Sequence, residues 1–248
     1  MAHYFVSDVH AGLVLEGRPC RSGERFAAWL DAVAPDAEEI YLLGDIFDFW
    51  FEYRQAIPKG YEPLLDKFKA LTAQGIQLHF FPGNHDMWTL DYLSRECGLK
   101  IHTDGYYAEI CGKKVYMEHG DRQSIGSAGE RLMQWIFRSK FARAVARRTV
   151  SHRKIMEFGN DWSRSNRAKH THPHIFKEER EGVVRFARKY LRKHEVDLFV
   201  FGHLHAPSAY ELSAGTMLYV LGDWITEREP VYGRLDKDGF SLEKFNPK

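Results

Sequence analysis

Five short blocks of polar residues constrain most strongly how this chain of 248 residues folds. Their members are of the types that bind metal ions, and most blocks follow an apolar, β-rich run. The blocks are Asp8-Val9-His10, Gly44-Asp45, Gly83-Asn84-His85-Asp86, His119-Gly120-Asp121 and Gly202-His203-Leu204-His205. Such runs predict strands, and active sites of open α/β sheets form beyond the carboxyl ends of strands. We therefore expect the blocks to meet at one edge of a sheet.

The periodicity of the chain predicts an α/β (α+β) fold. Strands are expected at 3–6, 40–43, 78–81, 114–117, 198–201, 217–221, 231–235 and 240–245, and helices at 24–33, 63–74 and 179–194. This order is satisfied by two mixed sheets packed face to face with helices outside. A chain of this length, with 44% hydrophobic residues, can bury one sizeable core. We expect a single domain spanning residues 1–248.

The mixture of candidate ligands indicates both the metal and the chemistry. Carboxylate, amide and imidazole donors suit Mn²⁺, Fe²⁺ or Zn²⁺ better than Ca²⁺, and no cysteine lies in any block. Two such ions about 3.5 to 4 Å apart can activate water and clamp the oxygens of a phosphoryl group. The blocks therefore predict hydrolysis of a phosphoester or phosphoanhydride.

Each block alone also has a simpler interpretation. The Asp8 and Gly44-Asp45 blocks could be turns or caps, and Asn84 could cap a helix that continues to Asp91. Their joint occurrence after strands favours the metal site. Three further carboxylates, Asp48, Asp86 and Asp121, are expected to orient the ligand imidazoles from behind.

The order of the blocks, D-x-H, G-D-x-x-D, G-N-H-D, H-G-D and G-H-x-H, resembles that of the calcineurin-like metallophosphoesterase superfamily. The resemblance implies a four-layer αββα sandwich and assigns Asp45 and His85 to catalysis. Asp45 would bridge two metal ions, and His85 would face the substrate phosphate. The implied ligands are Asp8, His10 and His205 for one ion and Asn84, His119 and His203 for the other.

The segment from about residue 122 to 176 interrupts this pattern and is strongly basic. It contains twelve Lys or Arg against three acids, a net charge of +9, so the remainder carries −8 in a chain whose total is +1. Such asymmetry predicts contact with an anionic partner. Two apolar sets recur at helical spacing: Leu132, Trp135 and Ile136, then Phe137, Phe141 and Val145. These helices either rest on a membrane or acyl chain, or dock onto the sheet.

Within the superfamily, the run Leu42-Leu43-Gly44-Asp45-Ile46-Phe47-Asp48-Phe49-Trp50 and the basic insertion are similar to UDP-2,3-diacylglucosamine hydrolases of lipid A synthesis. That resemblance implies a helical lid, a Mn²⁺ cofactor, with Fe²⁺ or Zn²⁺ as alternatives, and cleavage of UDP-2,3-diacylglucosamine to UMP and lipid X. Well-known members carry Arg where this chain has His85. The implied substrate contacts are Asn84, His85, Ser163, Arg164, Asn166, Arg167, Lys169 and His203.

Two other functions share the same blocks. A related phosphodiesterase would act on a nucleotide or nucleic acid, and its activity would not depend on acyl chains in the substrate. A non-catalytic scaffold of the same fold would be expected to have lost metal ligands. If the substrate is UDP-2,3-diacylglucosamine, no nucleic acid partner is expected. Without a signal-like start or a long apolar run, we expect a cytoplasmic protein, peripheral on the inner membrane. The sequence leaves the oligomeric state open.

Overall fold

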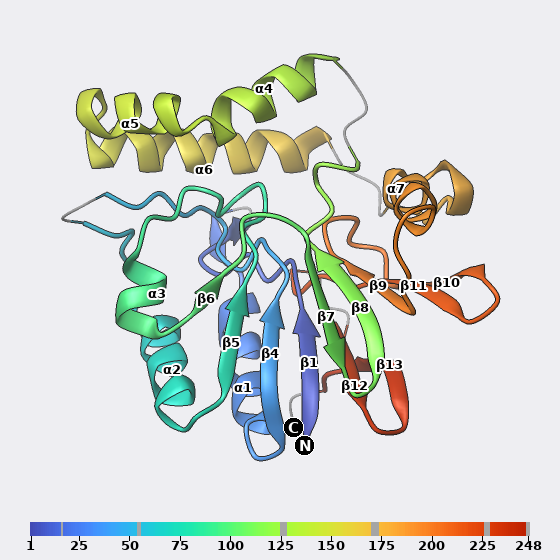
Figure 1. Cartoon of the computed structure of the whole chain (residues 1–248). Helices are drawn as coiled ribbons and strands as arrows, with labels where there is room; N and C mark the ends of the chain where they lie inside the picture. The colour runs from blue at the N-terminus through green and yellow to red at the C-terminus, as the bar shows by residue number, and fades with distance from the viewer. Residues whose placement is uncertain (16, 54–55, 125–127, 170–173, 226–228, 247–248) are drawn as a thin grey trace.

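Two mixed β-sheets form the centre of the protein (Figure 1). The computed structural model describes all residues except 16, 54–55, 125–127, 170–173, 226–228 and 247–248. In the first sheet, β1 and the three strands after it in the sheet order run parallel, while β12 and β13 are antiparallel. The order is β13 (Gly239–Lys244), β12 (Val231–Asp236), β1 (Ala2–Val6), β4 (Ala37–Leu42), β5 (Gln77–Phe80) and β6 (Lys100–Ile101).

The second sheet has three central parallel strands between two antiparallel edges. Its order is β10 (Ser208–Ser213), β11 (Thr216–Val220), β9 (Leu198–Phe201), β8 (Lys113–Glu118) and β7 (Tyr106–Ile110), and a separate ribbon pairs β2 (Val14–Leu15) with β3 (Arg18–Pro19). The edge strands β7 and β10 are absent from the sequence prediction. Along both strands, more and less exposed residues alternate, which is the pattern of a strand with one solvent-exposed face.

Helices cover the outer face of each sheet. α1 (Ser22–Val33), α2 (Glu62–Ala73) and α3 (Tyr92–Cys97) share a core with the first sheet, and α7 (Gly182–Leu191) shares one with the second. In α1, Phe26, Trp29, Leu30 and Val33 are buried at the spacing of one helix face. A third core, which includes Phe5 and Val200, fills the space between the sheets. The predicted αββα sandwich is confirmed.

The helix predicted at 179–194 is shorter in the structure. Glu178–Arg180 forms a 3₁₀ turn (η1), and α7 begins only at Gly182. Glu181 between them is extended, and its buried carboxylate accepts a hydrogen bond from the Lys177 amide at 2.8 Å. A side chain at Gly182 would collide with the Gln123 carbonyl. Tertiary contacts therefore override the helical periodicity here.

The basic segment forms three helices, α4 (Ala128–Arg138), α5 (Lys140–Thr149) and α6 (His152–Lys169), which lie above the carboxyl ends of the central strands (Figure 1). They are called the lid below. The Trp88 indole donates a hydrogen bond to the Phe137 carbonyl at 2.8 Å and thereby ties α4 to the sandwich. Among the described residues, none of the helices is both long enough and apolar enough to cross a bilayer.

Candidate metal centre

The loops that leave five strands converge beneath the lid. These loops follow β1, β4 and β5 of the first sheet and β8 and β9 of the second. The strands point toward the same edge of the sandwich, so their carboxyl ends meet there (Figure 1). The loops carry all seven predicted ligands: Asp8, His10, Asp45, Asn84, His119, His203 and His205.

Most of these ligands occupy the left-handed backbone region. Positive φ angles occur at Asp8, His10, Asp45, His203 and His205. For residues other than glycine this conformation costs about 1 to 3 kcal/mol and concentrates at functional sites. Bonds between the loops hold it, since the Asp8 amide donates to the Gly44 carbonyl at 3.0 Å and the His10 amide to the Asp45 carbonyl at 2.9 Å.

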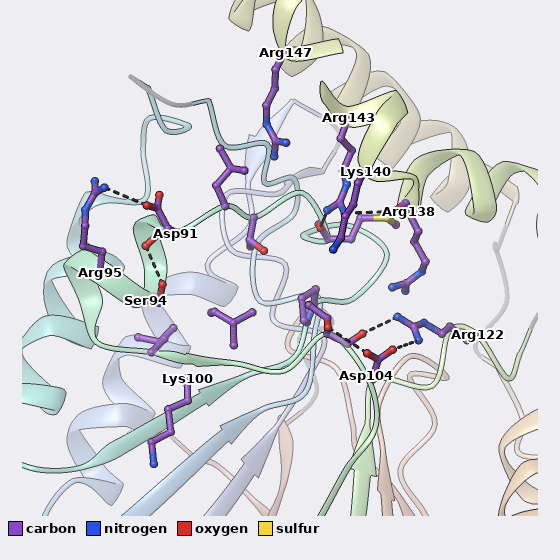
Figure 2. Close-up of a pocket in the computed structure, with 17 residues that line it drawn as sticks. Asp91, Ser94, Arg95, Lys100, Asp104, Arg122, Arg138, Lys140, Arg143 and Arg147 are labelled. Carbon is purple, nitrogen blue, oxygen red and sulfur yellow. Dashed lines mark hydrogen bonds and ion pairs between the residues drawn. The ribbon is translucent and has the colours of Figure 1, made fainter. Parts of the chain in front are cut away.

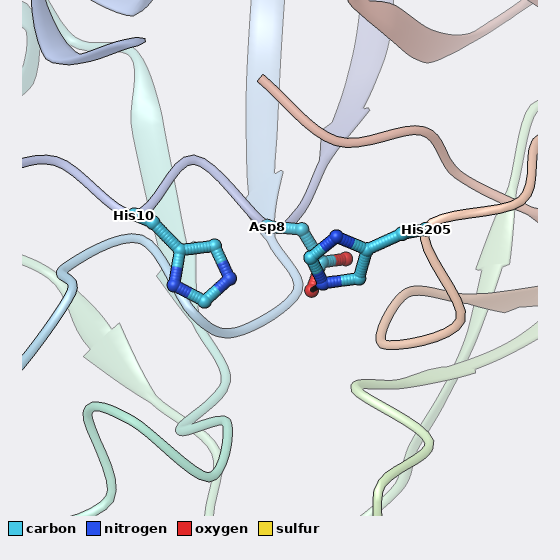
Figure 3. A group of neighbouring side chains, drawn as sticks. All are labelled: Asp8, His10 and His205. Carbon is cyan, nitrogen blue, oxygen red and sulfur yellow. Dashed lines mark ion pairs between the residues drawn. The ribbon is translucent and has the colours of Figure 1, made fainter. Parts of the chain in front are cut away.

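The first donor group comprises Asp8, His10 and His205 (Figure 3). One donor atom from each lies within 4.8 Å of the others. The His205 Nε2 is 3.2 Å from Asp8 Oδ1, while its Nδ1 is 3.6 Å from Asp223 Oδ2. In His10 the Nδ1 is 3.5 Å from Asp48 Oδ1. In both rings a carboxylate therefore sits behind Nδ1, and Nε2 is presented as the donor.

The second donor group comprises Asp45, His119 and His203, again with donor atoms within 4.8 Å of one another. The His119 Nδ1–H donates to the Leu43 carbonyl at 2.8 Å, so Nε2 is the ring nitrogen left to bind a metal ion. That Nε2 is 3.4 Å from Asp45 Oδ2 and 3.3 Å from Asn84 Oδ1. The amide oxygen of Asn84 therefore completes this donor set.

Asp45 lies between the two groups. Its Oδ2 is 3.8 Å from His10 Nε2 on one side and 3.4 Å from His119 Nε2 on the other. Its Oδ1 accepts a hydrogen bond from the His85 amide at 2.8 Å, which orients the carboxylate. The side chain is almost fully buried. This is the position that a bridging carboxylate requires.

The electrostatics of the centre fit a divalent cation. Burial disfavours the Asp45 carboxylate, yet the imidazoles of His119 and His85 hold its pKa well below the usual value. Burial likewise opposes protonation of His119, but Asp45 raises its pKa to about 10. A bound divalent cation would take over the charge compensation that this proton supplies. Carboxylate, imidazole and amide donors together suit Mn²⁺, Fe²⁺ or Zn²⁺.

Glycines let the loops approach this closely. Gly44 has a φ of +85°, and a Cβ there would lie 2.6 Å from His119 Nδ1. A Cβ at Gly83 would collide with the Asp45 carboxylate, and one at Gly202 would lie 2.8 Å from Asp8 Oδ2. The glycines in three of the blocks therefore make room for the donors.

The three predicted orienting carboxylates have different surroundings. Asp48 lies behind His10, as predicted. Asp121 is buried and pairs with Arg138 at 2.5 Å. Burial opposes its ionisation, but Arg138, followed by His119 and His203, lowers the pKa of its carboxyl. Asp86 also lies directly behind the metal loops, but its carboxylate accepts hydrogen bonds from their backbone amides and not from an imidazole. These amides belong to Gly83, Asp45, Ile46 and Phe47.

Sequence reasoning missed Asp223, which lies behind His205. Its signal was present, since Gly222-Asp223 follows the apolar strand β11 in the same way that Gly44-Asp45 follows β4. Sequence reasoning also missed Trp162 of α6, whose ring centroid is 4.7 Å from that of His85. No local pattern pairs these two residues, because they come from separate parts of the chain.

The predicted substrate contacts fall into two sets. His85, Asn84 and His203 lie at the donor groups. Ser163 is buried, and its hydroxyl donates to Asp48 at 3.0 Å, so it joins α6 to the metal loops, and direct contact with substrate stays a prediction. The predictions for the side chains of Arg164, Asn166, Arg167 and Lys169 lie outside the described residues, although their backbone belongs to α6.

Comparisons with known proteins agree with this geometry. The calcineurin-like phosphoesterase family matches residues 1–207. The UDP-2,3-diacylglucosamine hydrolase of Porphyromonas gingivalis is 35% identical, over 90% of this chain and 90% of its own. The enzyme of the same name from Vibrio vulnificus is 27% identical over 98% of both chains.

A solved structure shares the fold at low sequence identity. An archaeal phosphodiesterase superposes with a TM-score of 0.50 and 13% identity, covering 99% of this chain and all of its own. At that identity the likeness concerns the fold alone. It agrees with the four-layer arrangement of sheets and helices.

Proposed function

Since the chain belongs to the calcineurin-like phosphoesterase family, we propose that it is a UDP-2,3-diacylglucosamine hydrolase. It would cleave the pyrophosphate to release UMP and 2,3-diacylglucosamine 1-phosphate, lipid X. The observation that carries this proposal is a complete set of seven metal donors directly beneath a helical lid with an apolar underside. The identity of 35% to a hydrolase of that name supports the choice of substrate.

The proposed cofactor is a pair of divalent ions, with Mn²⁺ first and Fe²⁺ or Zn²⁺ as alternatives. One ion would be held by Asp8, His10 and His205, and the other by Asn84, His119 and His203. Both ions would share the carboxylate of Asp45. When bound, such ions stabilise charge on phosphoryl oxygens and lower the pKa of a water molecule. The protein contributes the fixed positions of the donors and the carboxylates behind them.

His85 is the proposed partner of the reacting phosphoryl group. Its Nδ1–H donates to the Asp48 carbonyl at 2.8 Å, which leaves Nε2 for the substrate. Burial lowers the pKa of His85 to about 4, so the ring is neutral near pH 7. A phosphoryl anion beside it would favour the protonated ring. His85 is thus placed to hydrogen-bond the substrate and to give a proton to the leaving oxygen.

The underside of the lid is the proposed site for the acyl chains. Phe49, Phe51, Met87 and Trp88 of the sandwich form a buried cluster against which Phe137, Ala146, Ile155 and Met156 of the lid pack. Trp162 extends this apolar surface to His85. Acyl chains would enter by separating these packed surfaces of the lid and the sandwich, and burial of the chains stabilises binding by about 0.8 kcal/mol per CH₂ group.

We expect the purified, Mn²⁺-loaded protein to release UMP from UDP-2,3-diacylglucosamine at least about tenfold faster than from the deacylated analogue at the same low concentration, because only the acylated compound buries apolar surface under the lid. The measurement is UMP release by chromatography. Equal rates on both compounds would indicate the general phosphodiesterase instead. No release from either, at full metal occupancy, would contradict the proposal.

We further propose that the protein acts in the cytoplasm, peripheral on the inner membrane. The outer side of the lid supports this. Leu132, Trp135 and Phe141 are 59%, 70% and 79% exposed, although docking onto the sheet would have buried them. Of the second apolar set, only Phe137 packs inward, against Trp88. The exposed Arg131 lies next to Leu132 in α4, as expected for contact with an anionic lipid surface.

The double variant Trp135→Ser/Phe141→Ser is expected to bind vesicles containing anionic phospholipid about tenfold less tightly, because each side chain loses apolar contact with the bilayer. Co-sedimentation with vesicles measures this. Tyr107→Ser, an exposed aromatic residue on β7, is the matched control. Unchanged vesicle binding of the double variant would exclude the lid as the membrane contact.

A further inference from the structure

A basic cavity of about 1300 Å³ lies beside the metal centre, between the lid and the β6 edge of the first sheet (Figure 2). Its walls come from α3 and the loop before it, from β6 and the loop after it, from Arg122, and from the junction of α4 and α5. The cations in its walls are Arg95, Lys100, Arg122, Arg138, Lys140, Arg143 and Arg147, against the two carboxylates of Asp91 and Asp104.

The carboxylates in the walls are already occupied. Asp91 pairs with Arg95 at 3.2 Å, and Asp104 pairs with Arg122 at 2.9 Å. Arg138, on the metal side, pairs with Asp121. Three of the seven cations in the cavity walls are therefore paired with carboxylates, and both carboxylates in the walls already have an arginine partner.

The α5 arginines bind backbone carbonyls instead. Arg143 donates to the Met87 carbonyl at 3.1 Å, and Arg147 donates to the Glu52 carbonyl at 2.7 Å. The Glu52 carboxylate itself accepts bonds from three backbone amides at 90–92. In addition, the Nε–H groups of Arg138 and Arg143 are buried without an acceptor among the described residues. Carbonyl dipoles do not cancel a full charge, so the cavity retains positive charge.

The cavity is adjacent to the second donor group. Pro82, Thr103, Asp104, Arg122 and Arg138 line both this cavity and a smaller hollow whose other walls include His119 and Asp121. His119 belongs to the second donor group. An anion in the basic cavity would therefore lie on the side of the centre that holds His119.

An apolar cluster and α6 also lie next to the centre. There Ser163 bonds Asp48 and Trp162 packs on His85, next to the apolar underside of the lid. A pyrophosphate diester extends in two directions from the bond that is cleaved. In the proposed substrate one direction is acylated and the other carries the nucleotide, so a centre flanked by an apolar cluster and by a basic cavity matches both halves.

We infer that the basic cavity binds the nucleoside monophosphate half of the substrate and holds UMP after cleavage. This inference rests on the proposed function. Cationic side chains attract phosphate oxygens. Lys140 is an exposed cation in the cavity wall, and the arginines around it add positive charge. Thr89, Ser94 and Thr103 in the walls offer hydroxyls to the polar parts of a nucleoside.

Lys140→Glu is the sharpest test, because Lys140 is exposed at the start of α5 while Arg143 and Arg147 also fasten the lid to the sandwich. Replacing a cation by an anion at the cavity is expected to weaken UMP inhibition about tenfold and to raise KM, with kcat, metal content and lipid X inhibition unchanged. Lys237→Glu, exposed in the turn between β12 and β13, is the control and should match the wild type.

Direct calorimetric binding of UMP and of inorganic phosphate separates this inference from the proposed function. Weaker UMP binding by Lys140→Glu supports the cavity even if the wild type fails to hydrolyse UDP-2,3-diacylglucosamine. Hydrolysis by the wild type combined with unchanged UMP affinity in the variant overturns the inference alone. The assignment to the nucleotide is overturned if the wild type binds inorganic phosphate as tightly as UMP. It is also overturned if Lys140→Glu weakens inhibition by UMP and by lipid X to the same extent.

Discussion

Asp45→Asn is expected to reduce kcat/KM on UDP-2,3-diacylglucosamine by at least about 10³-fold and to lower the metal content of the purified protein. The physical reason is the position of Asp45 within reach of both donor groups. Asparagine keeps the shape and can still accept the hydrogen bond from the His85 amide, but it removes the negative charge that both ions would share. Turnover and metal per chain, by elemental analysis, measure the two effects.

Asp66→Asn is the matched control, since Asp66 is an exposed residue of α2 that pairs with Lys69 far from the metal loops. It should retain wild-type turnover and metal content. An Asp45→Asn protein with the full metal content and wild-type turnover would show that no shared ion depends on this carboxylate. Loss of turnover with metal retained would instead assign Asp45 a role in positioning His85.

The sequence was most informative where ligand blocks and strands coincide. A polar residue directly after a parallel buried strand has its place determined by the sheet, so Asp8, Asp45 and His119 could be assigned to one edge without knowledge of any contact. The convergence of two sheets at this edge then followed from the family resemblance. The helix alternative for Asn84 is wrong, because the next helix, α3, begins only at Tyr92.

The sequence was least informative where a role depends on contacts between distant segments. Asp86 has the spacing of an imidazole-orienting residue, yet its carboxylate binds backbone amides, and burial beside Asp45 raises its pKa to about 7. The contact of Trp162 with His85 joins positions far apart in the chain. The basic cavity is formed by three separate segments and was visible beforehand only as an excess of charge in the lid.

His85→Ala is expected to lower kcat by about 10²- to 10⁴-fold, the usual contribution of a positioned acid or base, with metal content retained. The structure separates these effects, because the His85 amide, which orients Asp45, survives the substitution while the imidazole is lost. The ring sits beside both Asp45 and His10 and keeps its Nδ1–H on the Asp48 carbonyl. Turnover and metal per chain are again the measurements.

His85→Arg distinguishes proton transfer from charge neutralisation, since arginine stays protonated and cannot return a proton at neutral pH. If His85 protonates the leaving oxygen, His85→Arg stays slow and its rate loses the pH dependence that the imidazole imposes. If His85 only binds the phosphate, His85→Arg recovers most of the turnover that His85→Ala loses. Wild-type turnover in His85→Ala would remove His85 from the mechanism altogether, and the phosphate would then depend on the basic cavity for its protein contacts.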